Sequence, residues 1–279
     1  MDKKIVAKGL FILLLMVGPC FAGGCAENLS AQQSADVPAE TSAEEAEPNS
    51  VEQVLTQLKQ KTAELKSYQC HVEYEVNQPL YETKTLRKGI LYYAEFGEIS
   101  NLRVNFQTLK QDDEKEQKYI EQYIFDGVWL MYIDYQSEQV KRYQQAEPNE
   151  PVDAFELARR NLPIIGFTKI EELKKEFEIK LVEQQKDEPE NFIQLHLKVK
   201  RGSIYKDDYI SIDFWIDKKL GLPAKVVAVS TEPAGEEQKD TFQIKFLKPK
   251  VNKKIDKNIF EFGVPKGFTV EVEPLKEKD

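Results

Sequence analysis

Apolar and polar residues alternate along most of this chain with a period of two, which is typical of β-strands. In residues 70–76, four apolar side chains occupy one phase, while His71, Glu73 and Glu75 occupy the other. Later segments repeat the pattern, namely 102–107, 193–199, 210–216 and 242–246. Alternation of this kind indicates antiparallel strands with one face on an apolar interior and the other face in water.

A helical period occurs in three shorter places. Ser50 and Gln53 form a capping box at the start of an amphipathic helix, which we expect over Val51–Lys66. Two further helices are expected within 152–160 and 168–176. The order is therefore one helix, a run of strands, a helical insertion and a second run of strands.

Turn residues separate the expected strands. Asp126-Gly127 stands between the strand-like segments 123–125 and 128–130, and it predicts a two-residue hairpin. These elements together predict a mainly β fold with some α-structure. About nine to eleven strands would form one strongly curved antiparallel sheet, an incomplete β-barrel covered by a few helices. Such a sheet encloses either an apolar cavity or a filled core, and the alternation is compatible with both.

The first fifty residues differ in composition from the rest. Residues 1–24 have three lysines before the apolar run Leu10–Val17, which is too short to span a bilayer but typical of a signal peptide. Residues 25–50 contain no aromatic residue and little to bury, so we expect a disordered acidic linker there. One folded domain, 51–279, then remains.

The end of the signal segment resembles the lipobox of bacterial lipoproteins. Ala22-Gly23-Gly24 precedes Cys25, and in such lipoproteins small residues precede the cysteine that receives the lipid. Ala22 replaces the usual leucine, so ordinary signal-peptide cleavage nearby is the alternative. Lipid attachment at Cys25 would anchor the domain to a membrane of the bacterial envelope, on its periplasmic side, with the linker as a tether.

Charge and cysteine content narrow the possible functions. The chain of 279 residues has a formal net charge of −9. The signal segment contributes +2 and the linker −6, which leaves −5 on the folded domain. An acidic domain argues against nucleic-acid binding, which needs a basic face. Three cysteines are too few for a disulfide-stapled scaffold, whereas 41% apolar residues can form a sizeable core.

Residues that commonly carry catalysis are scarce. His71 and His196 both lie in the polar phase of expected strands, where a solvated side chain is the usual outcome. Cys70 lies in an apolar phase, which favours a buried and inert thiol. The cluster Asp112-Asp113-Glu114 lacks the ligand spacing of a calcium site, and no phosphate-binding or hydrolase motif is present. We therefore expect that the protein is not an enzyme and that it has neither a cofactor nor a metal site.

Several segments resemble the LolA/LolB superfamily of bacterial lipoprotein-sorting proteins. The resemblance covers about residues 50–275 and rests on the order of the elements more than on any single motif. The segments that carry it are Val51–Lys66 followed by Ser67-Tyr68, Gly89-Ile90-Leu91-Tyr92, Ile124–Asp134 with Gln139-Val140, Phe214–Lys225, and Phe260-Glu261-Phe262 with Pro265-Lys266-Gly267. The carriers have a basic residue after the second strand, where this chain reads Tyr93-Ala94-Glu95-Phe96-Gly97. That departure argues against active lipoprotein transfer but is compatible with acyl binding.

The resemblance implies a half-barrel with a helical lid, whose apolar cavity holds the acyl chains of lipids or lipoproteins. We expect a monomer with eleven residues on the cavity wall: Val72, Tyr74, Leu102, Val104, Phe106, Leu195, Leu197, Ile212, Phe214, Phe242 and Ile244. The alternative is an envelope sensor or assembly protein, with the same fold and a filled core, that acts as a protein-interaction module.

Overall fold

The computed structural model describes residues 50–154, 157, 170–183, 191–235 and 237–275. The signal segment, the linker up to Asn49 and Cys25 lie outside these residues. The described strands are β1 (Ser67–Gln78), β2 (Thr83–Phe96), β3 (Ile99–Gln111), β4 (Gln117–Phe125), β5 (Trp129–Asp134), β6 (Gln139–Gln144), β7 (Phe177–Val182), β8 (Phe192–Val199), β9 (Tyr209–Asp217), β10 (Pro223–Ser230), β11 (Thr241–Val251) and β12 (Thr269–Glu273).

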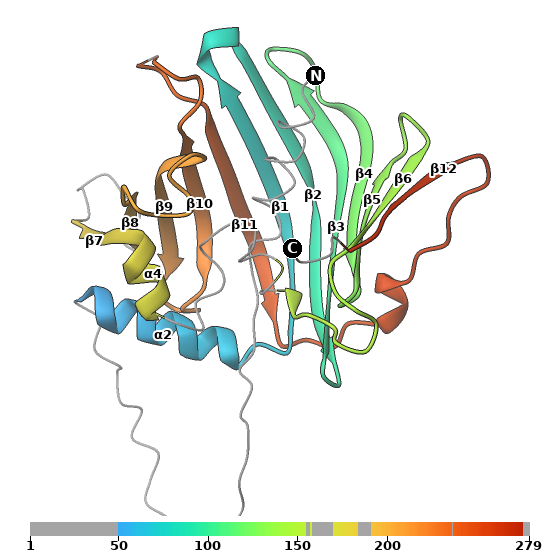
Figure 1. The fold of residues 1–279 in the computed structure, drawn as a ribbon, viewed down its shortest axis with the longest axis horizontal. Helices are drawn as coiled ribbons and strands as arrows, with labels where there is room; N and C mark the ends of the chain where they lie inside the picture. The colour runs from blue at the N-terminus through green and yellow to red at the C-terminus, as the bar shows by residue number, and fades with distance from the viewer. Residues whose placement is uncertain (1–49, 155–156, 158–169, 184–190, 236, 276–279) are drawn as a thin grey trace, which may run out of the picture.

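The strands form a single curved sheet, which confirms the predicted fold class (Figure 1). Their order is β12-β6-β5-β4-β3-β2-β1-β11-β10-β9-β8-β7, so the two runs of strands meet where β1 pairs with β11. The described sheet has twelve strands, more than the nine to eleven expected. The antiparallel pattern also has one exception, because β12 pairs with β6 in parallel.

Helix α2 (Val51–Ala63) lies across one end of the half of the sheet formed by β7–β11 (Figure 1). It begins as predicted, since the Ser50 hydroxyl accepts a hydrogen bond from the Gln53 amide at 3.3 Å. It ends three residues earlier than the expected Lys66. Its apolar side packs into the main core through Val54, Leu55 and Leu58.

The other expected helices are described only in part. Helix α4 (Ile170–Glu176) lies within the segment expected to be helical. In the segment 152–160, Ala154 and Leu157 are helical, and residues 155–156 and 158–160 lie outside the description. Two short 3₁₀ turns, η1 (Pro79–Tyr81) and η2 (Lys257–Phe260), complete the elements. None of the described helices combines the length and apolar character needed to cross a membrane.

The Asp126-Gly127 turn is one residue longer than predicted. Strand β5 starts at Trp129, so Val128 belongs to the loop. The Asp126 carboxylate accepts hydrogen bonds from the amides of Val128 (3.0 Å) and Trp129 (2.7 Å). Gly127 adopts a φ of 97°, which a residue with a side chain rarely takes.

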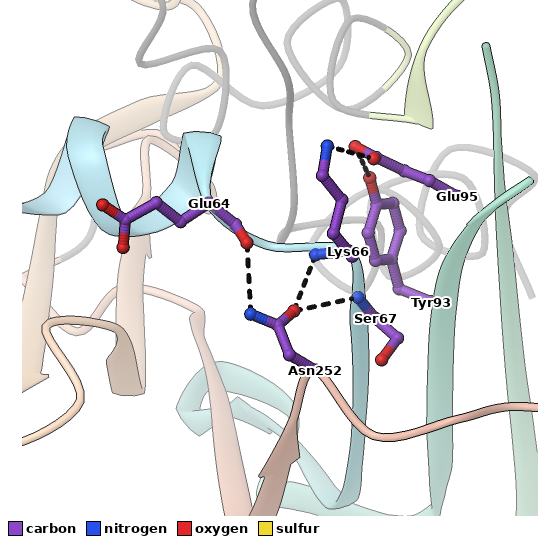
Figure 2. A network of polar contacts seen from close by, with 6 residues as sticks. All are labelled: Glu64, Lys66, Ser67, Tyr93, Glu95 and Asn252. Carbon is purple, nitrogen blue, oxygen red and sulfur yellow. Dashed lines mark hydrogen bonds and ion pairs between the residues drawn. The ribbon is translucent and has the colours of Figure 1, made fainter. Parts of the chain in front are cut away.

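Asn252 fastens the end of α2 to the sheet (Figure 2). Its side-chain oxygen accepts from the amides of Lys66 (2.7 Å) and Ser67 (3.3 Å), and its side-chain nitrogen donates to the Glu64 carbonyl at 3.1 Å. Its φ of 52° lies in the left-handed region that asparagine tolerates. These contacts end the helix before Lys66 and direct the chain into β1.

Replacing Asn252 by alanine should lower the free energy of unfolding by about 2–4 kcal/mol, because three hydrogen bonds are lost and the left-handed backbone becomes strained. Asn252→Gly loses the same hydrogen bonds but tolerates the backbone, so it should be less destabilising by about 1 kcal/mol. Urea unfolding of both variants checks the expectation. Wild-type stability in the alanine variant would contradict it.

Candidate functional site

The eleven predicted lining residues all lie in one apolar cluster on one face of the sheet. Each is at most 3% exposed. The side chains of α2 that pack on the sheet belong to the same cluster, so this face is the concave one (Figure 1). The structure therefore brings these residues together, and their contact with a ligand stays a prediction.

Strand register arranges part of this face as a ladder across the strands. From β7 to β1 the directly paired residues are Leu181, Leu195, Phe214, Val226, Ile244 and Tyr74. Paired residues in a sheet project from the same side, so these side chains form one continuous row. Five apolar side chains thus lead to a tyrosine, and the next residue in the row is Arg87 on β2.

Arg87 belongs to a partly buried polar cluster on the concave side of β1–β5, which we call the Arg87 cluster: Tyr74, Arg87, Tyr119, Glu121, Tyr123 and Tyr132. The Arg87 Nε lies 3.5 Å from the Glu121 Oε2, and the two side chains are 19% and 5% exposed. The guanidinium lies 5.8 Å from the centre of the Tyr119 ring. The Tyr123 hydroxyl donates to the other Glu121 oxygen. An ion pair is thus held within a mostly apolar face.

Two groups of the Arg87 cluster have no hydrogen-bond partner. The Tyr74 hydroxyl and the Arg87 Nε are buried and form no hydrogen bond among the residues that the structure describes, although the Nε is ion-paired with Glu121. Buried polar groups are almost always hydrogen-bonded, because an unpaired one costs about 1–3 kcal/mol. Burial also raises the pKa of Tyr74 well above its ordinary value, so its hydroxyl keeps the proton and is a donor.

Electrostatics keep Arg87 charged despite its burial. Burial lowers its pKa, but Glu121 and the neighbouring tyrosines outweigh that effect and raise it. The pKa of Tyr123 is also raised, first by burial and then by Glu121. At neutral pH the cluster is therefore rich in hydrogen-bond donors, and its one acidic group on β4 already accepts from Tyr123.

The sequence contains a sign of this cluster, namely charged residues in the apolar phase of two strands, which the alternation pattern by itself does not identify. Arg87 has the same phase on β2 as the buried Leu91 and Tyr93, and Glu121 has the same phase on β4 as Tyr123 and Phe125. A charged residue in the apolar phase of a strand is rarely placed there unless it is paired. The partner itself could only be identified from the register.

The residues considered as catalytic or metal-binding candidates have surroundings typical of structural or surface residues. His71 is exposed, and the His196 Nδ1 contacts the Asp213 carboxylate at 2.9 Å. Cys70 is buried, and burial raises the pKa of its thiol to about 12. Asp112 accepts from the Lys84 amide at 2.6 Å in an exposed turn. Across the described residues, no group of three or more potential metal ligands comes together.

A cavity of about 440 Å³ lies on the opposite, outer face of the sheet. It is bordered by β3, β5 and β6 and by the C-terminal segment, and its walls include Met131, Val140, Arg142, Phe260 and Phe262. None of the eleven predicted lining residues borders it. Beside it, Phe262 and Phe268 pack against a second, smaller apolar cluster of Ile124, Ile133 and Val140.

Comparisons with known proteins find similarity at the level of solved structures. No protein-family model matches the sequence, and no curated protein matches it. An uncharacterised conserved protein from Thermus thermophilus is 13% identical with a TM-score of 0.46, over 80% of this chain and 98% of that one. The Pseudomonas aeruginosa MucA/MucB complex is 13% identical with a TM-score of 0.42, over 75% of this chain and 60% of that one. A LolA superfamily protein from Nitrosomonas europaea is 11% identical with a TM-score of 0.33, over 76% of this chain and 97% of that one. LolA superfamily proteins are thus among the solved structures to which this chain is similar.

Proposed function

We propose that this protein binds the acyl chains of a lipid or lipoprotein on the concave face of its sheet, in the bacterial cell envelope. The observation that carries the proposal is the apolar ladder from Leu181 to Ile244, which the register makes continuous over five strands. Each methylene that such a face removes from water contributes about 0.8 kcal/mol, so binding needs no covalent chemistry. A chain laid across strands about 4.8 Å apart would meet one apolar side chain per strand.

Ala228 offers a direct test of this binding. It is buried beside the ladder, where it pairs with Ile212 and Phe242. Ala228→Phe adds a ring to the concave face and should weaken the binding of a fluorescent fatty acid about tenfold or more, the equivalent of two or three lost methylenes. The matched control is Val227→Phe, which adds a ring to the outer face of the same strand and should leave the affinity within about twofold.

Ala228→Phe also distinguishes acyl binding from the alternative function, a protein-interaction module with a filled core. In a filled core, Ala228→Phe would overpack the interior and cost about 1–3 kcal/mol of stability, with no ligand to displace. No binding of the fluorescent fatty acid by the wild-type protein, together with such a loss, would reject acyl binding and favour the interaction module.

Export and anchoring complete the proposed function. The segment 1–24 directs export, and Cys25 attaches the protein to a membrane through a lipid. Support comes from the small residues before Cys25 and from the acidic linker after it. Cys25→Ala should move the protein from the membrane to the soluble fraction, as measured by fractionation and immunoblotting. Unchanged fractionation would exclude this anchor.

A further inference from the structure

Two buried donor atoms of the Arg87 cluster form no hydrogen bond within the part of the chain that the structure describes. They are the hydroxyl of Tyr74, a residue only 2% exposed, and the Arg87 Nε, which forms an ion pair with Glu121 at 3.5 Å but no hydrogen bond. Arginine offers five N–H donors and no acceptor, and a buried tyrosine that keeps its proton offers one more. A group that binds to these two atoms must therefore be a hydrogen-bond acceptor.

Tyr74 and Arg87 lie at one end of the apolar ladder. They are the next two residues of the row after its five apolar members, which run from Leu181 to Ile244. A ligand that lay along the row would have its apolar chain over β8–β11 and its polar end at β1 and β2. Helix α2 leads into the start of β1 at Ser67, whereas Tyr74 lies about 20 Å further along that strand. The polar end would therefore lie away from the helix.

We propose that Tyr74 and Arg87 form a polar subsite that binds the carbonyl oxygen of an acyl ester, so that the ligand class is ester-linked acyl chains of the acylglycerol type. The proposal rests on the acyl binding proposed above. Tyr74 and Arg87 donate to the ester oxygen, and the attached chain extends over the ladder.

The charges of the cluster favour an ester over a free carboxylate. Arg87 is already neutralised by Glu121, and Asp134 pairs with Glu121 in the register of β4 and β5. A fatty-acid carboxylate would bring another negative charge beside these carboxylates in a poorly hydrated place, where like charges repel strongly. An ester oxygen accepts the same hydrogen bonds without a charge. Selectivity for the uncharged head group follows from this arrangement.

Three probes with the same twelve-carbon chain test the subsite: monolauroylglycerol, laurate and dodecyltrimethylammonium. Each competes with an apolar fluorescent dye bound to the full-length protein. We expect wild-type protein to bind monolauroylglycerol about tenfold more tightly than dodecyltrimethylammonium, which has no acceptor, and more tightly than laurate.

Two variants then assign the effect to the named residues. Tyr74→Phe removes only a hydroxyl that has no hydrogen-bond partner, and the double variant Arg87→Met/Glu121→Gln removes the donor without leaving a lone charge. Each should lower the preference for monolauroylglycerol over dodecyltrimethylammonium about fivefold to tenfold, with both affinities taken from competition against the dye. Tyr135→Phe is the matched control, because Tyr135 packs on Phe268 at the outer face.

The outcomes separate the two proposals. If none of the probes binds, acyl binding fails and the subsite fails with it. If all three bind wild-type protein equally and the variants change nothing, the apolar face binds chains and the subsite is wrong. Tighter binding of laurate than of monolauroylglycerol would overturn the preference for an ester.

Discussion

Replacing Arg87 alone by methionine is expected to lower the free energy of unfolding by about 3–5 kcal/mol, the largest effect of any single exchange considered for this protein. The reason is the carboxylate left behind. Glu121 has a side chain only 5% exposed, and without Arg87 it would be a buried charge with no cation beside it. Urea unfolding at neutral pH, monitored by tryptophan fluorescence, measures the loss.

The double variant Arg87→Met/Glu121→Gln should recover most of that loss. Removing both charges eliminates the desolvation cost as well as the attraction, and the glutamine can still accept from Tyr123. Its stability should lie within about 1 kcal/mol of the wild type. Equal losses in the single and double variants would show that the two side chains are not coupled.

Lys88 provides a matched control on the same strand. It points to the outer face, and its ammonium group lies 2.6 Å from the Glu116 carboxylate with both side chains well exposed. Exposed pairs contribute little because water screens them, so Lys88→Met should cost less than about 1 kcal/mol. The contrast between neighbouring positions 87 and 88 would show that burial, rather than pairing as such, decides the cost.

The alternation of the sequence was sufficient to predict one face of the sheet. On β1 it assigns Val72 and Tyr74 to the interior and His71 to water, as the structure has them, because a period of two allows only two faces. The capping of α2 by Ser50 could also be predicted, since a cap depends on residues three apart. Local patterns of this kind need no knowledge of the tertiary structure.

Features that depend on register could not be predicted. Irregularities in pairing occur between Lys88 and Gly89 and between Phe106 and Thr108, and they determine which residue of β4 faces Arg87. The parallel pairing of β12 with β6 joins segments far apart in the chain. Asn252 reaches the end of α2 for the same reason. Such contacts depend on the global arrangement, for which a single sequence holds no short-range signal.

Stability should fall steeply in alkaline solution, because the concave face buries phenol and thiol groups in their protonated forms. Burial raises the pKa of Cys70 to about 12 and that of Tyr119 to about 12, and it also raises the pKa of Tyr74, Tyr132 and Tyr209. In the unfolded chain these groups would lose protons near the ordinary values of 9.0 for cysteine and 10.0 for tyrosine.

The sign of the effect follows from proton binding. Between the unfolded and the folded pKa, the unfolded chain has released a proton that the folded protein still holds, so raising the pH favours unfolding. The contribution of each group is complete below its unfolded pKa and is lost above it, at about 1.4 kcal/mol per pH unit for each group. Several groups acting together should make the fall between pH 10 and pH 11 amount to several kcal/mol.

Two variants separate the contributions of the thiol and of a phenol, because each contribution begins at a different pH. Cys70→Ala removes a group that acts from about pH 9, and Tyr74→Phe removes one that acts only from about pH 10. Urea unfolding at pH 8, 9, 10 and 11 should therefore show a reduced slope from pH 9 in the first variant and only from pH 10 in the second. Slopes equal to that of the wild type would mean that these groups release their protons in the folded protein. A buried face that stays protonated while the unfolded chain ionises is the physical basis of the expected alkaline unfolding.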